Sequence, residues 1–155
     1  MPMKIAPARA LAILVVLLSG GCDTRLPVPD ATLLEVNAAV NRQGLPCPRD
    51  YCQDDWPDPA DLPQLEYWDC KAYAVAKAHR LIGQYGYSPN RLEYLLIAGP
   101  PLRVTHAALL VDGRWVMDLG LRCQVCELDR FVAGVTVTGR LPVNELPLVV
   151  RMLRR

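Results

Sequence analysis

The sequence of 155 residues predicts an α+β domain in which helices come first and an antiparallel sheet follows. One observation is a helical segment over residues 69–85, rich in Ala, Lys and Leu, and another is the change to short apolar segments after residue 90. A third is the Asp112-Gly113 pair between two such segments, which is typical of a hairpin turn. The chain is 52% hydrophobic with a formal net charge of +1, so composition favours one folded domain over a polybasic nucleic-acid binder.

Residues 1–21 are typical of a bacterial lipoprotein signal peptide. Lys4 and Arg9 precede the apolar run Leu11–Leu18, which is too short to span a bilayer. The small residues Ser19-Gly20-Gly21 then lead into Cys22, an arrangement that resembles a lipobox, in which the signal is cut before the cysteine and that cysteine carries the lipid. The alternative is an ordinary cleaved signal with Cys22 in a disulfide. We expect a lipid anchor on the periplasmic side of the cell envelope.

The mature chain divides into a tether, residues 22–29, and one domain, residues 30–155. A first helix is expected over Asp30–Gln43, with Asp30 as N-cap and Gly44 after its end. Asp58-Pro59 indicates a short helical turn, and Asp69–Tyr85 the main helix. The strands expected after it are Arg91–Ile97, Val104–Val111, Trp115–Leu119, Phe131–Thr138 and Leu148–Leu153.

Four of the six cysteines form two closely spaced pairs. Cys47 and Cys52 are separated by four residues, and Cys123 and Cys126 by two. Outside the cytoplasm these four are expected to form two disulfides, and both local and crossed pairings remain open. A four-cysteine zinc site is an alternative that an oxidising compartment disfavours, and a redox role for Cys123 and Cys126 lacks the strand-then-helix context of a thioredoxin site.

Cys70 is the cysteine left over, and its position favours a nucleophile. It begins the main helix, with Asp69 before it as N-cap. Free backbone N–H groups and partial positive charge at a helix N-terminus stabilise a thiolate. The Cys70 N–H could also face an oxyanion formed on an attacked carbonyl. An inert buried thiol is the alternative.

The chain offers two histidines as a base for Cys70. His79 is expected on a solvated face of the helix, whereas His106 lies near the start of an apolar strand. Asp118 is a carboxylate within a second apolar segment, so it should have a partner that can orient the His106 ring. The two side chains share a face only if the hairpin loop has an odd length, such as Val111-Asp112-Gly113, or contains a bulge.

These residues resemble the bacterial transglutaminase-like cysteine peptidase family over about residues 50–120. The resemblance implies a papain-like, transglutaminase-like core with a triad that falls on Cys70, His106 and Asp118. The similar motifs are Trp56-Pro57, Asp69-Cys70-x-x-Tyr73-Ala74-x-Ala76-Lys77, Thr105-His106 and Met117-Asp118-Leu119.

The resemblance also bears on cofactors and on the oxyanion hole. Acidic residues after the family cysteine bind calcium in some members, but Lys71 and Ala72 stand here, so no calcium site is expected. No other cofactor is expected. Related domains use an upstream side chain in the oxyanion hole, for which Gln64 and Trp68 are the candidates.

The expected function is a membrane-tethered periplasmic cysteine peptidase that cleaves an envelope protein through a thioester intermediate. Capture of the thioester by an amine, which would make the enzyme a transamidase, is less favoured. The alternative from another class is a non-catalytic lipoprotein that uses the same fold for binding or scaffolding. No nucleic-acid partner is expected.

Overall fold

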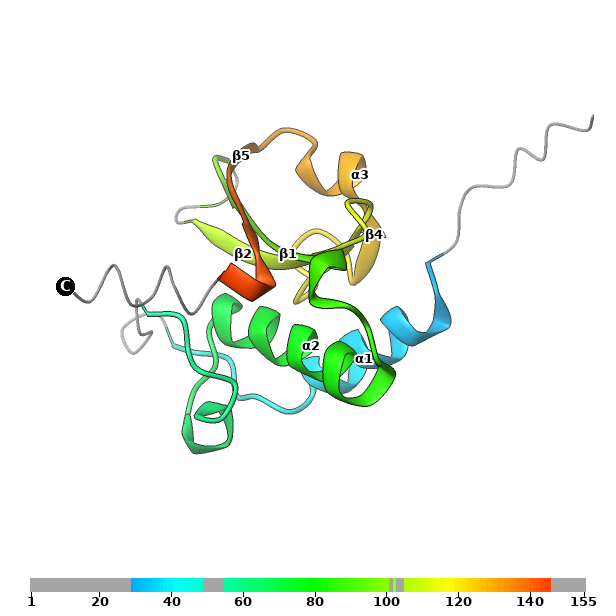
Figure 1. Cartoon of the computed structure of the whole chain (residues 1–155). Coiled ribbons are helices and arrows are strands. Elements are labelled where there is room, and N and C mark those ends of the chain that lie inside the picture. The colour runs from blue at the N-terminus through cyan, green and yellow to red at the C-terminus, as the bar shows by residue number, and fades with distance from the viewer. Residues whose placement is uncertain (1–28, 49–54, 101, 103–104, 146–155) are drawn as a thin grey trace, which may run out of the picture.

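The computed structural model describes residues 29–48, 55–100, 102 and 105–145 (Figure 1). The expected signal segment, Cys22, Cys52 and the expected strand Leu148–Leu153 lie outside the described residues. The longer elements in chain order are α1 (Ala31–Asn41), α2 (Cys70–Tyr85), β1 (Leu92–Ala98), β2 (His106–Val111), β3 (Trp115–Met117), β4 (Val125–Glu127), α3 (Leu128–Val132) and β5 (Thr136–Pro142). Short 3-10 helices cover Leu62–Gln64, Pro89–Arg91 and Val143–Glu145.

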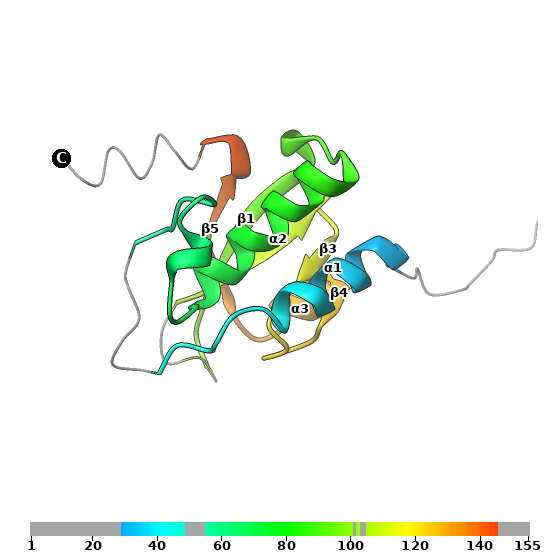
Figure 2. The same ribbon diagram turned by 90° about the horizontal axis from the view of Figure 1, so that it is seen from below.

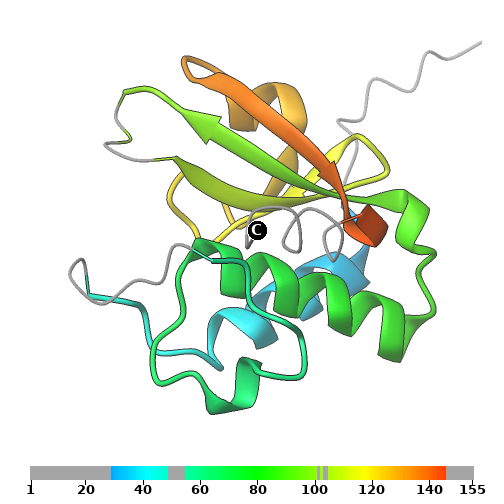
Figure 3. The same ribbon diagram turned by 60° about the vertical axis from the view of Figure 1, so that its left-hand side comes forward.

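Within the described part of the chain, five strands form one antiparallel sheet in the order β4-β3-β2-β1-β5. Helices α1 and α2 cover one face of the sheet, and α3 lies against the other face (Figures 1 and 3). The prediction of an α+β domain with helices before an antiparallel sheet is confirmed.

Both long helices begin at the aspartates expected to cap them. The Asp30 side chain accepts a hydrogen bond from the Thr32 N–H, and the Asp69 side chain accepts one from the Ala72 N–H at 2.9 Å. Helix α2 ends at Gly86, whose φ of +67° suits a residue without a Cβ. The two helices pack side by side and run in opposite directions (Figure 2).

The hairpin between β2 and β3 has a three-residue loop. Val111 pairs with Trp115, which leaves Asp112, Gly113 and Arg114 as the loop, one residue later than expected. Asp112 and Gly113 have φ values of +54° and +65°. Because the loop length is odd, the alternation of side chains gives Asp118 the same parity as His106.

The expected strand Phe131–Thr138 is wrong in its first half. Leu128, Phe131 and Val132 have helical spacing and form α3, from which the fully buried Phe131 packs against the sheet. Gly134, with a φ of +75°, then turns the chain so that β5 begins at Thr136.

Two buried clusters lie on the two faces of the sheet. The larger joins α1, α2 and residues such as Tyr94 and Met117, while the smaller gathers around Phe131. Within the residues that the structure describes, no helix has the length and apolar character needed to cross a membrane.

Candidate active site

Cys70 is the first residue of α2, and its thiol is free and partly exposed. The Asp69 carboxylate before it serves two partners: Oδ1 accepts from the Ala72 N–H, and Oδ2 lies 2.8 Å from Lys71 Nζ. The cap fixes where the helix starts, and therefore fixes the position of the thiol. Lys71 compensates the Asp69 charge close to Cys70.

A tightly packed segment leads into this helix. The Trp68 N–H donates to the Leu45 carbonyl at 2.8 Å, and the Trp68 carbonyl accepts from the Cys47 N–H at 3.0 Å. The Trp68 ring lies so close to Gly44 that an added Cβ would come within 2.5 Å of Trp68 Cδ2. Tyr73 Oη donates to the Gly44 carbonyl at 2.8 Å. Gly44 therefore provides close approach for Trp68, in addition to following the end of α1.

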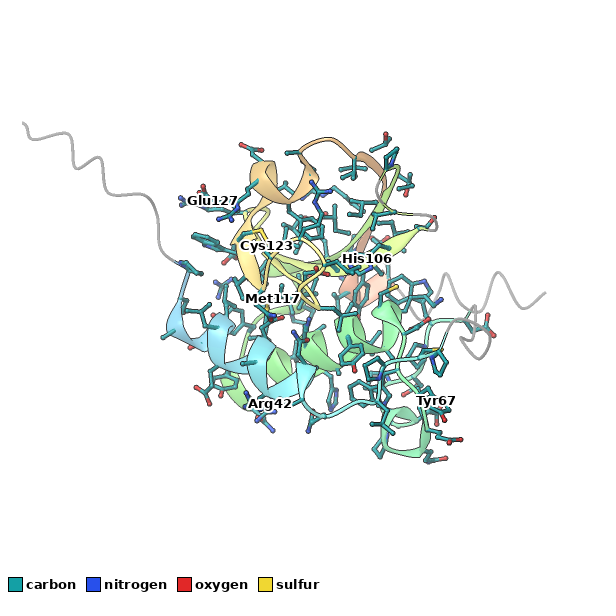
Figure 4. All side chains as sticks on the ribbon, turned by 180° about the vertical axis from the view of Figure 1, so that it is seen from behind. Arg42, Tyr67, His106, Met117, Cys123 and Glu127 are labelled. Carbon is teal, nitrogen blue, oxygen red and sulfur yellow. A yellow bond between two sulfur atoms is a disulfide. The ribbon has the colours of Figure 1, made fainter. Side chains whose placement is uncertain are left out.

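His106 is the first residue of β2, and its side chain lies between Asp118 and Cys70. Only 4% of the residue is exposed. Its Nε2 lies 2.5 Å from Asp118 Oδ1, and the Cys70 thiol is a neighbour that acts to raise the pKa of the ring. Since Nε2 is occupied by Asp118, Nδ1 is the ring atom left for the thiol. Figure 4 shows His106 over the end of α2 that follows the loop with Tyr67.

Asp118 directly follows β3, and both of its carboxylate oxygens have partners. Oδ1 faces His106, and Oδ2 accepts from the backbone N–H groups of Gly120, Leu121 and Arg122 at 3.2, 2.9 and 3.4 Å. The Asp118 N–H donates to the Gln124 carbonyl at 2.9 Å. The loop after β3 thus encloses a carboxylate that is only 1% exposed.

The electrostatics of this pair favour a protonated imidazole next to an ionised carboxylate. Burial acts to lower the pKa of His106, but the hydrogen bonds and charges of Asp118 and Cys70 outweigh it and raise the pKa to about 9. Burial acts to raise the pKa of Asp118, yet the hydrogen bond and charge of His106 keep it below its ordinary value. His106 is therefore a group that readily accepts and holds a proton at neutral pH.

Lys77 is a charged neighbour to which sequence reasoning assigned no role. It lies two turns after Cys70 on α2, with only 1% of the residue exposed. Burial lowers the pKa of its amine to about 7, against an opposing attraction from the Asp118 carboxylate. The signal that could have found it is a lysine at the i+7 position from the nucleophile, on the same side of the helix.

The structure therefore brings the three residues predicted as a triad together. Among the described residues, neither candidate for the oxyanion hole has a hydrogen bond to any of the three. Trp68 is buried in the core, where its ring packs against Gly44 and Tyr73. Gln64 is an exposed residue at the end of a 3-10 helix. His79 is exposed on α2, as expected.

The cysteine pairs follow the local pairing where the structure describes them. Cys123 and Cys126 form a disulfide with each other. Cys47 is also disulfide-bonded, so the crossed arrangement with Cys123 or Cys126 is ruled out. Among the described residues, no group of three or more His, Cys, Asp and Glu side chains is arranged to hold a metal ion.

Comparisons with known proteins return no match for this chain. No family model, curated protein or solved structure matches it. The assignment of a function therefore depends on the chemistry of the site.

Proposed function

We propose that this protein is a cysteine peptidase that cleaves a protein of the bacterial cell envelope and is held at a membrane by a lipid on Cys22. The observation that carries the proposal is the contact of 2.5 Å between His106 Nε2 and Asp118 Oδ1, together with the influence on His106 of the only free thiol among the described residues, Cys70, which acts to raise the pKa of the ring. A nucleophile, a base and a residue that orients the base are the parts that covalent catalysis needs. The resemblance to transglutaminase-like cysteine peptidases supports the same function.

In acylation, Cys70 first passes its proton to His106, and the Sγ thiolate then attacks the carbonyl carbon of a peptide bond. The carbonyl becomes an oxyanion, which the Cys70 N–H at the start of α2 is suited to stabilise. The oxyanion then collapses, the C–N bond breaks, and His106 gives the proton to the departing amine. A thioester between Cys70 and the acyl half of the substrate is left.

In deacylation, water attacks the thioester carbonyl while His106 accepts one of its protons. The C–S bond breaks, the acid product leaves, and the proton on His106 returns to Cys70. Throughout this cycle Asp118 keeps the ring oriented and stabilises the imidazolium that forms twice. Its own three backbone donors hold the carboxylate in place while the charge on His106 changes.

The residues around Cys70 do not favour a calcium ion beside the thiol. The Asp69 carboxylate is already engaged by the Ala72 N–H and by Lys71, a cation that would repel calcium. We therefore propose that the enzyme works without a metal ion.

The test compares envelope proteins in bacteria that carry the wild-type chain, Cys70→Ala, His106→Ala or His79→Ala. Mass spectrometry of protein N-termini should reveal cleavage products that disappear in the first two variants and persist in His79→Ala, the matched control with an exposed histidine. Identical N-termini in all four strains would contradict the peptidase and favour the binding or scaffolding lipoprotein.

A further inference from the structure

A set of amide side chains from α1 reaches the loop that carries Asp118. Asn41 Nδ2 donates to the Asp118 carbonyl at 3.0 Å. Asn41 Nδ2 also donates to Gln124 Oε1 at 3.1 Å, and Asn37 Nδ2 donates to the same oxygen at 3.0 Å. We call Asn37, Asn41 and Gln124 the amide clamp. It connects a helix near the start of the domain to residues 77–87 positions later in the chain.

The amide clamp contains buried polar atoms that destabilise the fold and that packing alone does not require. Asn37 is 1% exposed on the buried face of α1. The Oδ1 atoms of Asn37 and Asn41 are both buried and have no hydrogen-bond partner. A buried acceptor without a partner destabilises a fold, so apolar residues would serve packing better at these positions. The presence of amides at these buried positions points to a role for their donor groups.

The loop that receives the clamp is fixed from both sides. The Gln124 carbonyl accepts from the Asp118 N–H at 2.9 Å, and the disulfide between Cys123 and Cys126 brackets Gln124 in sequence. The Asp118 backbone is therefore held at its N–H by the loop and at its carbonyl by Asn41. Within this frame the Asp118 side chain meets His106 Nε2.

We propose that Asn37, Asn41 and Gln124 are positioning residues, which act through Asp118 to hold His106 in its orientation toward Cys70. This inference rests on the proposed function, because positioning matters only if Cys70 is a nucleophile. The hydrogen bonds of the three amides are made to one another and to the Asp118 backbone, so each acts through the loop. Small displacements of a catalytic group reduce rates strongly, which is why a support of this kind matters.

The experiment measures His106 and Cys70 separately in the full chain. Ring resonances of His106, followed by NMR as a function of pH, report its protonation, and the rate of Cys70 alkylation by iodoacetamide at pH 6 reports reactivity. Asn41→Ala and Gln124→Ala should lower the pKa of His106 below that of the wild type and slow alkylation about tenfold. Gln124→Glu keeps an acceptor oxygen for both asparagines and should retain most of the wild-type rate.

Tyr85→Phe is the matched control for Asn41→Ala. Tyr85 Oη donates to Glu35 Oε1 at 3.0 Å, so this change also removes one hydrogen bond between α1 and the rest of the domain, but away from Asp118. It should leave His106 and Cys70 unchanged.

Several outcomes would overturn the proposal. If the clamp variants titrate and react as the wild type does, or if Tyr85→Phe has the same effect as Asn41→Ala, the clamp does not position Asp118. Gln124 is exposed, so its variants test the proposal even if Asn41→Ala does not fold. In a third outcome, Cys70 is unreactive in the wild type but the pKa of His106 still changes in the clamp variants. This outcome would contradict the peptidase, while the amide clamp would still be shown to position Asp118 and His106.

Discussion

Replacement of Asp118 by Asn tests the electrostatic core of the site. Asparagine keeps the shape of the side chain and a carbonyl oxygen for the backbone donors, but it removes the charge that pairs with His106. In the wild type the pKa of His106 is raised from 6.5 to about 9 in spite of burial. At about 1.4 kcal/mol per pKa unit, this favours the protonated ring in the folded protein by about 3 kcal/mol. Asp118→Asn should remove that preference.

The sign of the pH dependence follows from the raised pKa. The folded state binds the His106 proton more tightly than the unfolded state, so the stabilisation is complete below pH 6.5 and is lost as the pH rises through 9. Urea denaturation of Asp118→Asn should therefore show a loss of about 3 kcal/mol at pH 6, in the range expected for breaking a buried ion pair, and a smaller loss at pH 10. NMR should show the pKa of His106 lowered from its wild-type value of about 9, because the hydrogen bond and charge of Asp118 that oppose burial are lost. An equal loss at both pH values, or an unchanged His106 titration, would refute this reasoning.

Three further predictions concern the surroundings of the triad. Burial lowers the pKa of Lys77 from 10.5 to about 7, so the folded state binds fewer protons than the unfolded state between these pH values. In urea denaturation, the free energy of unfolding of the wild type should therefore rise relative to that of Lys77→Met by up to about 1.4 kcal/mol per pH unit between pH 7 and 10. A difference that stays constant with pH would contradict this. Gly44→Ala should clash with Trp68 and cost about 1–3 kcal/mol in thermal melts, whereas Gly83→Ala, with open space around it in α2, should stabilise by about 0.5–1 kcal/mol. Millimolar calcium should leave the melting temperature unchanged, because Lys71 neutralises the Asp69 carboxylate beside Cys70. A rise in the melting temperature would reveal a calcium site.

Features encoded by a few neighbouring residues could be predicted from the sequence. Asp69 and Gly86 mark the ends of α2 because a cap and a left-handed terminal residue are local properties. The triad followed from similar reasoning, since a cysteine at a helix start and a carboxylate within an apolar segment both require an explanation.

Features that depend on distant packing could not be predicted. Phe131 lies among β-branched residues that suit a strand, and only its burial against the sheet selects the helix α3. The hairpin loop shifted by one residue because the pairing of Val111 with Trp115 decides the register. Asn37 and Asn41, four residues apart on one side of α1, are a detectable polar feature, but their partner Gln124 lies more than 80 residues later.

The most direct measurement of the central claim is the rate at which iodoacetamide alkylates Cys70 at pH 6, read by peptide mass spectrometry in the wild type, His106→Ala and His79→Ala. If His106 activates the thiol, His106→Ala should slow the reaction on the order of 100-fold, while His79→Ala should react at the wild-type rate. Equal rates in all three proteins would contradict the claim that His106 activates Cys70 as a nucleophile.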